Sequence, residues 1–117
     1  CEIAATNCHD SVRIFRYMWN GMFQGKSIMD GITQQGHKAL NEKRIHPTQK
    51  PVALYEWLLM KYAKEGWRIL DTHLGSGSSR IAAYNLGFEF VGCEIEPTYF
   101  QLQEQRFAEH TAQVRMW

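Results

Sequence analysis

Two carboxylates and a short glycine loop are the residues of this sequence best suited to bind a charged small molecule. The loop and its leading acid run Asp71-Thr72-His73-Leu74-Gly75-Ser76-Gly77. At Gly75 and Gly77 the backbone can approach a ligand where a side chain would collide. A helix that begins after the loop would point its N–H groups at the same space. Glu94 ends the next expected strand, where acids in such units hydrogen-bond ribose hydroxyls.

Several ligand classes compete for this loop. A dinucleotide fold wants a third glycine three positions after the second, but that position is Arg80. A phosphate-binding nucleotide loop ends in Gly-Lys-Ser or Gly-Lys-Thr, and this loop has no lysine. S-adenosylmethionine suits the acids better, because it carries no phosphate and its ammonium group favours a nearby carboxylate. A glycine turn with a structural aspartate stays open as an alternative, since such loops often match by chance.

Alternating helix and strand signals predict the elements that would hold the loop. In chain order we expect a helix over 51–62, a strand over 68–71, a helix over 78–86, a strand over 88–94 and a helix from Pro97. Pro51 suits a first helical position, while Gly66 and Gly87 are natural stops. Strand, helix and strand this close together require parallel strands. We therefore expect the α/β class, here part of a Rossmann-like doubly wound sheet.

The N-terminal third gives weaker signals. Residues 2–6 are typical of a short strand, and the aromatic-rich stretch 12–23 suits either a helix or a strand. Residues 25–44 are polar and show no period, so we expect a long loop or a small insertion.

Composition excludes several classes of protein. Hydrophobic residues make up 44% and charged residues 21% of the 117 residues, as in ordinary globular domains. No apolar run approaches the roughly 20 residues that span a bilayer, and no signal peptide opens the chain. We expect a cytoplasmic protein with no membrane contact. The sequence has only three cysteines, a small and odd number that argues against a disulfide framework. Cys8 and His9 lack the partner spacing of a zinc site, so no metal site is expected.

The segment His46-Pro47-Thr48-Gln49-Lys50-Pro51 narrows these alternatives. It resembles the His-Pro-Thr-Gln-Lys-Pro segment of the amino-methyltransferases that modify adenine or cytosine in DNA. The helix, the glycine loop, the Glu94 strand and Pro97-Thr98-Tyr99-Phe100 follow in the order of that family, so the resemblance covers about residues 46–107. It implies a site-specific DNA-methyltransferase with S-adenosylmethionine as cofactor. We expect adenine rather than cytosine-N4 as the target. This expectation rests only on the general frequency of the two targets and on no residue of this sequence.

The resemblance also assigns the site residue by residue. Asp71, Gly75, Ser76 and Gly77 would wrap the methionine part of the cofactor, and Glu94 would hold its ribose. The cofactor-binding residues it implies are Thr48, Gln49, Lys50, Asp71, His73, Gly75, Ser76, Gly77 and Glu94. Two places depart from the family pattern. His73 stands where the family has a phenylalanine, and Ser78-Ser79 replaces a Thr-Thr pair while keeping hydroxyls that can cap a helix.

The residues that would receive the target base are missing from the sequence. The family places an acid or serine, a Pro-Pro pair and an aromatic residue around a base flipped out of the duplex. The three prolines here are Pro47, Pro51 and Pro97, so no Pro-Pro pair exists and no catalytic residue is assigned. We expect that motif upstream of Cys1 and a truncated chain that binds cofactor weakly and transfers no methyl group. A non-catalytic remnant and, with less support, an NAD-type module stay open as alternatives.

Charge and the resemblance together suggest where DNA would lie. Residues 1–50 carry a net charge of +3 and residues 51–117 a net charge of −2. In the family, residues 24–45 would fall among the target-recognition elements, so Lys26, Lys38, Lys43 and Arg44 are candidates for contacts with phosphates of double-stranded DNA. Solvated loop charge is the alternative.

The same reasoning divides the chain in two. Residues 1–45 form an N-terminal strand with a target-recognition or insert region, and residues 46–117 form the S-adenosylmethionine-binding βαβ region. We expect an exposed apolar face on this region, and with it either a homo-oligomer or a complementary segment that carries the catalytic motif. The setting would be restriction–modification or a phage-borne methylase.

Overall fold

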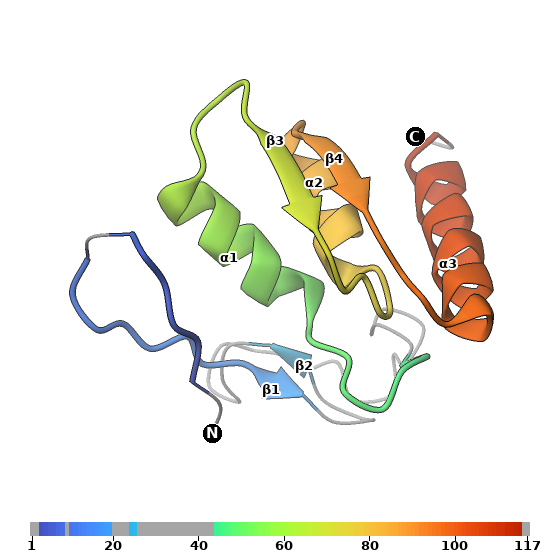
Figure 1. Ribbon diagram of the computed structural model, residues 1–117, viewed down its shortest axis with the longest axis horizontal. Helices are drawn as coiled ribbons and strands as arrows, with labels where there is room; N and C mark the ends of the chain where they lie inside the picture. The colour runs from blue at the N-terminus through green and yellow to red at the C-terminus, as the bar shows by residue number, and fades with distance from the viewer. Residues whose placement is uncertain (1–2, 9, 20–23, 26–43, 116–117) are drawn as a thin grey trace.

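The computed structural model describes residues 3–8, 10–19, 24–25 and 44–115 (Figure 1). The elements are β1 (Met18–Trp19), β2 (Gln24–Gly25), α1 (Val52–Tyr62), β3 (Arg68–Asp71), α2 (Ser78–Leu86), β4 (Glu89–Gly92) and α3 (Pro97–Arg115). No helix in these ranges is long and apolar enough to cross a membrane.

The strands β3 and β4 pair in parallel and are joined by α2. Arg68 lies opposite Glu89, and Asp71 lies opposite Gly92. In Figure 1, α2 lies behind this pair of strands and α3 stands beside β4. The expected βαβ unit and the α/β class are therefore confirmed. The second strand is shorter than the expected 88–94. At its start the N–H of Phe88 donates to the Ala83 carbonyl of α2, and beyond Asp71 the chain turns into the glycine loop.

The helix α1 ends at Tyr62, as the sequence predicts, but begins at Val52, one residue after the expected first position. Pro51 is its N-cap, in an extended conformation. Ala63 is its C-cap, and the N–H of Ala63 donates to the Leu59 carbonyl at 2.9 Å. Gly66, the expected stop, lies instead in the following turn with a φ of 88°. Residues 63–67 then reverse the chain into β3.

A small apolar cluster holds the three helices together. Val52 of α1 and Ile81 and Ala82 of α2 are buried, and Tyr55, Leu59 and Phe107 pack against them. Ala82 is completely buried. Because its side chain is a single methyl group, α1 and α2 can pack closely at this point. Close packing of this kind leaves little room for a larger residue.

The two faces of the β3–β4 pair differ sharply in exposure. Ile69 and Phe90 are half-buried, whereas Leu70 is 64% and Val91 49% exposed. Side chains alternate between the faces of a strand, so Leu70 and Val91 share the face opposite the half-buried pair. Parallel sheets are usually covered on both faces. Within the described residues, this second face is an exposed apolar surface.

The strand expected over residues 2–6 is wrong for the part that the structure describes. Residues 3–6 are exposed and have no regular structure. A strand is stable only when it pairs with another, and the sequence of a single segment does not reveal whether a partner is present. Within the stretch 12–23, the structure shows only β1, which pairs antiparallel with β2. Most of the expected loop at 25–44 falls outside the described residues.

The segment before β1 is attached to α1. The Tyr62 hydroxyl donates to Asp10 Oδ2 at 2.8 Å, and the Phe15 and Trp57 rings have centroids 5.4 Å apart. Arg13 donates to both oxygens of Asp10. The hydrogen bonds from Arg13 and then Tyr62 hold the pKa of Asp10 well below its usual range. The aromatic stretch thus packs on α1 through Phe15.

The close contact at Ala82 can be tested by overpacking. We expect Ala82→Leu to destabilise the protein by about 1–3 kcal/mol, because the added carbons have no free volume. Urea unfolding measures the change. Ala112→Leu is the matched control, since Ala112 is exposed on α3 and surface changes stay within about 0.5 kcal/mol. Equal stabilities for the two variants would contradict the packing described here.

Candidate functional site

Asp71 braces the two ends of the glycine loop. Its Oδ1 accepts the N–H of His73 at 3.0 Å, and its Oδ2 accepts the hydroxyl of Ser79 in the first turn of α2. The carboxylate thus links the end of β3 to the start of α2. The hydroxyl of Ser79 serves this brace and does not cap the helix, contrary to the sequence-based expectation for Ser78-Ser79. The N-cap is Gly77, in the left-handed conformation, and it has no side chain to contribute.

Glu94 ties the loop to the end of the neighbouring strand. Its Oε1 accepts the N–H of Gly75 at 2.7 Å, and its Oε2 accepts the N–H of Glu96 at 2.9 Å. These backbone donors, Glu96 first and then Gly75, lower the pKa of Glu94 below its ordinary value. Hydrogen bonds to a carboxylate favour its ionised form. Glu94 is therefore an anion with both oxygens oriented by the backbone.

Most N–H groups of the loop are satisfied inside the protein. Besides His73 and Gly75, the N–H of Leu74 donates to the Cys93 carbonyl at 2.8 Å and that of Gly77 to the Leu74 carbonyl at 2.9 Å. A loop that cradles phosphate points several such groups at the ligand. These four point at internal acceptors, so the loop is not a phosphate cradle of that kind.

The segment before α1 reaches the same loop through His46. The His46 and Tyr99 rings have centroids 4.3 Å apart, and His46 Cδ2 lies 3.9 Å from the position that a Cβ on Gly75 would take. His46 Nδ1 is 3.2 Å from the N–H nitrogen of Thr48 and 3.1 Å from its hydroxyl. His46 therefore joins the segment, the loop and the start of α3.

Sequence reasoning did not single out His46 or Tyr99. Both belong to motifs that carried the resemblance, so the signal was present. Their contact was not visible, because 52 residues separate them and only the packing of α3 brings the rings together.

Two of the residues expected to bind the cofactor are turned into the protein. Gln49 is 6% exposed, and its Oε1 accepts the N–H of Ile45 at 2.8 Å. Ser76 is 5% exposed, and its carbonyl accepts from Arg106 at 2.9 Å. Both shape the backbone around the site.

The other expected site residues lie toward the surface. Thr48 is exposed, and Lys50 Nζ donates to its carbonyl at 3.3 Å. His73 is also exposed, with Nδ1 2.9 Å from the Thr72 hydroxyl.

The DNA candidates fall mostly outside the described part of the chain. Arg44 is described and exposed, whereas Lys26, Lys38 and Lys43 lie among residues that the structure does not describe. Where side chains are described, no three His, Cys, Asp or Glu residues are grouped so that they could hold a metal ion.

Comparison with known proteins identifies the group to which this architecture belongs. The profile of the DNA methylases that modify N6 or N4 positions matches residues 9–105. The chain belongs to the N6/N4 DNA methylase family. Its α/β fold with parallel strands is similar to that of a methyltransferase of known structure. The crystal structure of the M1.HpyAVI–SAM complex matches with a TM-score of 0.53 and 39% identity, over 55% of this chain and 32% of that one.

Two curated methylases show how much of a relative the chain covers. Type II methyltransferase M2.DpnII of Streptococcus pneumoniae is 41% identical over 61 residues, which are 52% of this chain and 23% of that protein. Type II methyltransferase M.HpaI of Haemophilus parainfluenzae is 33% identical over 70 residues, or 60% of this chain and 22% of that protein. The chain thus spans less than a quarter of each of these relatives.

The tight approach at Gly77 leads to a first test of the site. A Cβ at this position would lie 3.1 Å from Gln103 Cβ, and the φ is 80°. We expect Gly77→Ala to destabilise the protein by about 1–2 kcal/mol from its left-handed backbone, and by more from the contact. Gly66→Ala is the control, because Gly66 has a φ of 88° and nothing within 4 Å. Urea unfolding should show the larger loss at Gly77; equal losses would rule out the contact.

The lowered pKa of Glu94 leads to a second test. The folded state favours the ionised form, so its contribution to stability is present above the ordinary glutamate pKa and is lost as pH falls through the lowered value. The gap in melting temperature between wild type and Glu94→Gln should therefore narrow from about pH 7 to about pH 3. Glu89→Gln, on the exposed pair with Arg68, controls for general acid effects. A gap that stays constant over this range would contradict the assignment.

Proposed function

We propose that this chain forms the S-adenosylmethionine-binding part of a site-specific DNA amino-methyltransferase. The observation that carries the proposal is the Glu94 carboxylate, with each oxygen held by one backbone N–H at the edge of a glycine loop. Membership of the N6/N4 DNA methylase family supports it. So does the likeness to M1.HpyAVI, a protein whose crystal structure is that of a complex with SAM.

The acceptor capacity of Glu94 matches a ribose. An ionised carboxylate offers about four lone-pair positions, and the N–H groups of Gly75 and Glu96 occupy two of them. One position remains on each oxygen. Two adjacent ribose hydroxyls supply two donors at the corresponding spacing. An anionic group such as phosphate would be repelled by this carboxylate and would find no donor on it.

The inward N–H groups of the loop favour a cofactor without phosphate. An NAD-type module would need the loop to bind a pyrophosphate, but the N–H groups of residues 73, 74, 75 and 77 all have internal acceptors. S-adenosylmethionine has a sulfonium, an ammonium and one carboxylate, so the acids Asp71 and Glu94 complement its positive charge. These features support S-adenosylmethionine over NAD as the ligand.

We assign the remaining roles as follows. The methionine part of the cofactor lies against a wall formed by Asp71, Gly75, Ser76 and Gly77. Ser76 and Gly77 contribute to this wall through their backbone. Thr48, Lys50 and His73 contribute exposed polar groups at its border, and Gln49 shapes the segment that carries Thr48. Residues 46–117 are the cofactor-binding region, and residues 1–45 belong to target recognition. Bound S-adenosylmethionine would supply an electrophilic methyl group for an exocyclic amino nitrogen.

The target we propose is adenine in double-stranded DNA, with cytosine-N4 as the second choice. The base must leave the duplex stack to reach the methyl group. The family pattern for receiving it includes a Pro-Pro pair, and this sequence has none. We propose that the chain alone binds cofactor and transfers no methyl group. Lys26, Lys38, Lys43 and Arg44 would contact DNA phosphates, in a cytoplasmic restriction–modification setting.

Calorimetry with S-adenosylhomocysteine tests the cofactor assignment. We expect the chain to bind this compound and to bind NAD more weakly or not at all. Glu94→Gln should weaken binding by about tenfold, because an amide nitrogen cannot accept a ribose hydroxyl. Glu89→Gln, an exposed acid at the other end of β4, should leave the affinity unchanged. Preference for NAD would overturn the proposal, as would equal affinities for wild type and Glu94→Gln.

A methyl-transfer assay tests the second half of the proposal. The chain is incubated with labelled S-adenosylmethionine and double-stranded DNA. We expect no label in the DNA even when calorimetry shows binding. Efficient labelling would show that the residues receiving the base are present in this sequence without a Pro-Pro pair.

A further inference from the structure

The glycine loop has a second side, which rests on helix α3. Arg106 Nη1 donates to the Ser76 carbonyl at 2.9 Å and to the Ser78 hydroxyl at 3.0 Å. Ser78 is the first residue of α2 and is 2% exposed. One guanidinium group therefore holds the end of the loop and the start of the following helix. Arg106 lies 30 positions after Ser76, so this contact depends on how α3 packs.

These bonds fix the orientation of one peptide plane. In a trans peptide the carbonyl and the N–H point in opposite directions. For the peptide between Ser76 and Gly77, the carbonyl accepts from Arg106, while the N–H donates to the Leu74 carbonyl at 2.9 Å. Both ends of the plane are thus held, and it cannot rotate without breaking both bonds. The conformation of the loop is thus set by α3 as well as by Glu94.

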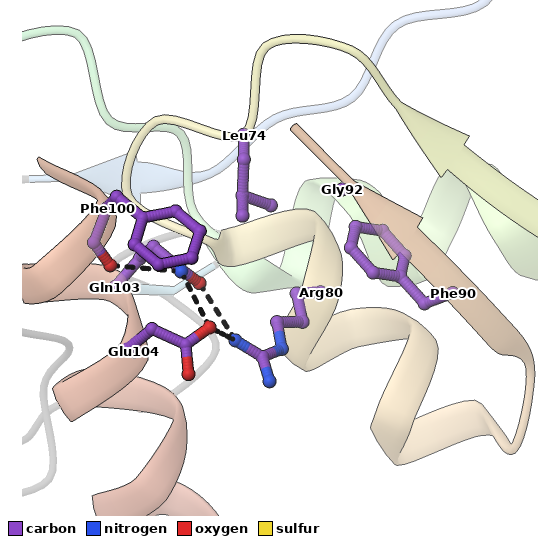
Figure 2. A pocket seen from close by; sticks show the side chains of 7 residues that line it. All are labelled: Leu74, Arg80, Phe90, Gly92, Phe100, Gln103 and Glu104. Atoms are coloured by element: carbon purple, nitrogen blue, oxygen red, sulfur yellow. Dashed lines mark hydrogen bonds and ion pairs between the residues drawn. The ribbon is translucent and has the colours of Figure 1, made fainter. Parts of the chain in front are cut away.

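Gln103 acts on the same loop by close contact. It lies one turn before Arg106 on the same face of α3 and is 1% exposed. Its Cβ would be 3.1 Å from a Cβ on Gly77. Figure 2 shows its amide braced by three partners: Arg80 donates to its Oε1 at 3.0 Å, and its Nε2 donates to the Phe100 carbonyl and to Glu104. The same side chains line one side of a cavity of about 240 Å³ beside β4. Gln103 is therefore a rigid support under Gly77.

We propose that Arg106 and Gln103 are positioning residues for the cofactor loop. They hold the Ser76–Gly77 peptide in place so that Gly75 and Glu94 meet in the arrangement that accepts the ribose. The inference rests on the proposed function, because it gives the loop a ligand. Neither side chain needs to touch the cofactor. Their effect is on the affinity and on the local opening of the loop.

The test compares variants of the full chain in two measurements. Arg106→Met removes the donors and keeps an apolar stem of similar reach, whereas Arg106→Lys keeps a charge and a compact donor. The control is Arg68→Met, which removes an exposed arginine from its pair with Glu89 on the outer face of the sheet. Calorimetry gives the affinity for S-adenosylhomocysteine, and amide hydrogen exchange without ligand gives the opening at Gly75 and Gly77.

We expect Arg106→Met to weaken binding on the order of tenfold and to speed exchange at Gly75 and Gly77 by a similar factor. Exchange in β3 and β4 should stay unchanged. Arg106→Lys should recover part of both effects, and Arg68→Met should show neither. If Arg106→Met does not fold, Arg106→Lys carries the comparison, with an intermediate loss confined to the loop as the expected result.

The outcomes separate this inference from the proposed function. If the wild type binds S-adenosylhomocysteine and Arg106→Met binds it with the same affinity, the inference is overturned and the proposed function stands. Exchange that rises equally across the loop and both strands would also overturn it, because Arg106 would then only stabilise the fold. Absence of binding in wild type, with faster exchange confined to the loop, would overturn the proposed function while confirming that Arg106 holds the loop.

Discussion

The candidate site depends on one hydrogen bond between the ends of two neighbouring strands. A carboxylate that follows one strand accepts a backbone N–H from the loop that follows the other. Glu94 follows β4 and receives the N–H of Gly75, which lies between β3 and α2. The two meet because parallel strands bring their carboxyl ends to the same edge of a sheet. Together with the bond from the Leu74 N–H to the Cys93 carbonyl, it ties the glycine loop to the acid.

Two sets of contacts hold the loop, and its two glycines are required for different reasons. On one side Gly75 faces Glu94 and the ring of His46, which is itself packed on Tyr99. On the other side Gly77 rests so closely on α3 that a side chain would collide. The first contact leaves a carboxylate poised to accept hydroxyl donors. The second sets the path of the backbone. A site with its own bonds already made needs little rearrangement when a ligand enters.

The arrangement also explains why the family assignment and the chemistry agree. In the proposed function, the inward N–H groups of the loop and the carboxylates beside it would suit a cationic methyl donor better than a phosphate-bearing nucleotide. The chain covers less than a quarter of each of two curated methylases. The exposed apolar face of Leu70 and Val91 lies on the same small sheet as the candidate site.

Sequence alone determined the elements whose signals are local. The bounds of β3 and α2 and the start of α3 follow from apolar spacing, Gly87 and Pro97, because these features act within a few residues. Only the tertiary structure decided what those elements hold together. It turned Gln49 and Ser76 inward, directed the Ser79 hydroxyl to Asp71, and left residues 3–6 without the expected strand. It also placed Arg106 behind the loop. These outcomes depend on which groups the fold brings together. The partner is 30 positions away for Arg106 and Ser76 but only four for Gln49 and Ile45, and no local pattern specifies that choice.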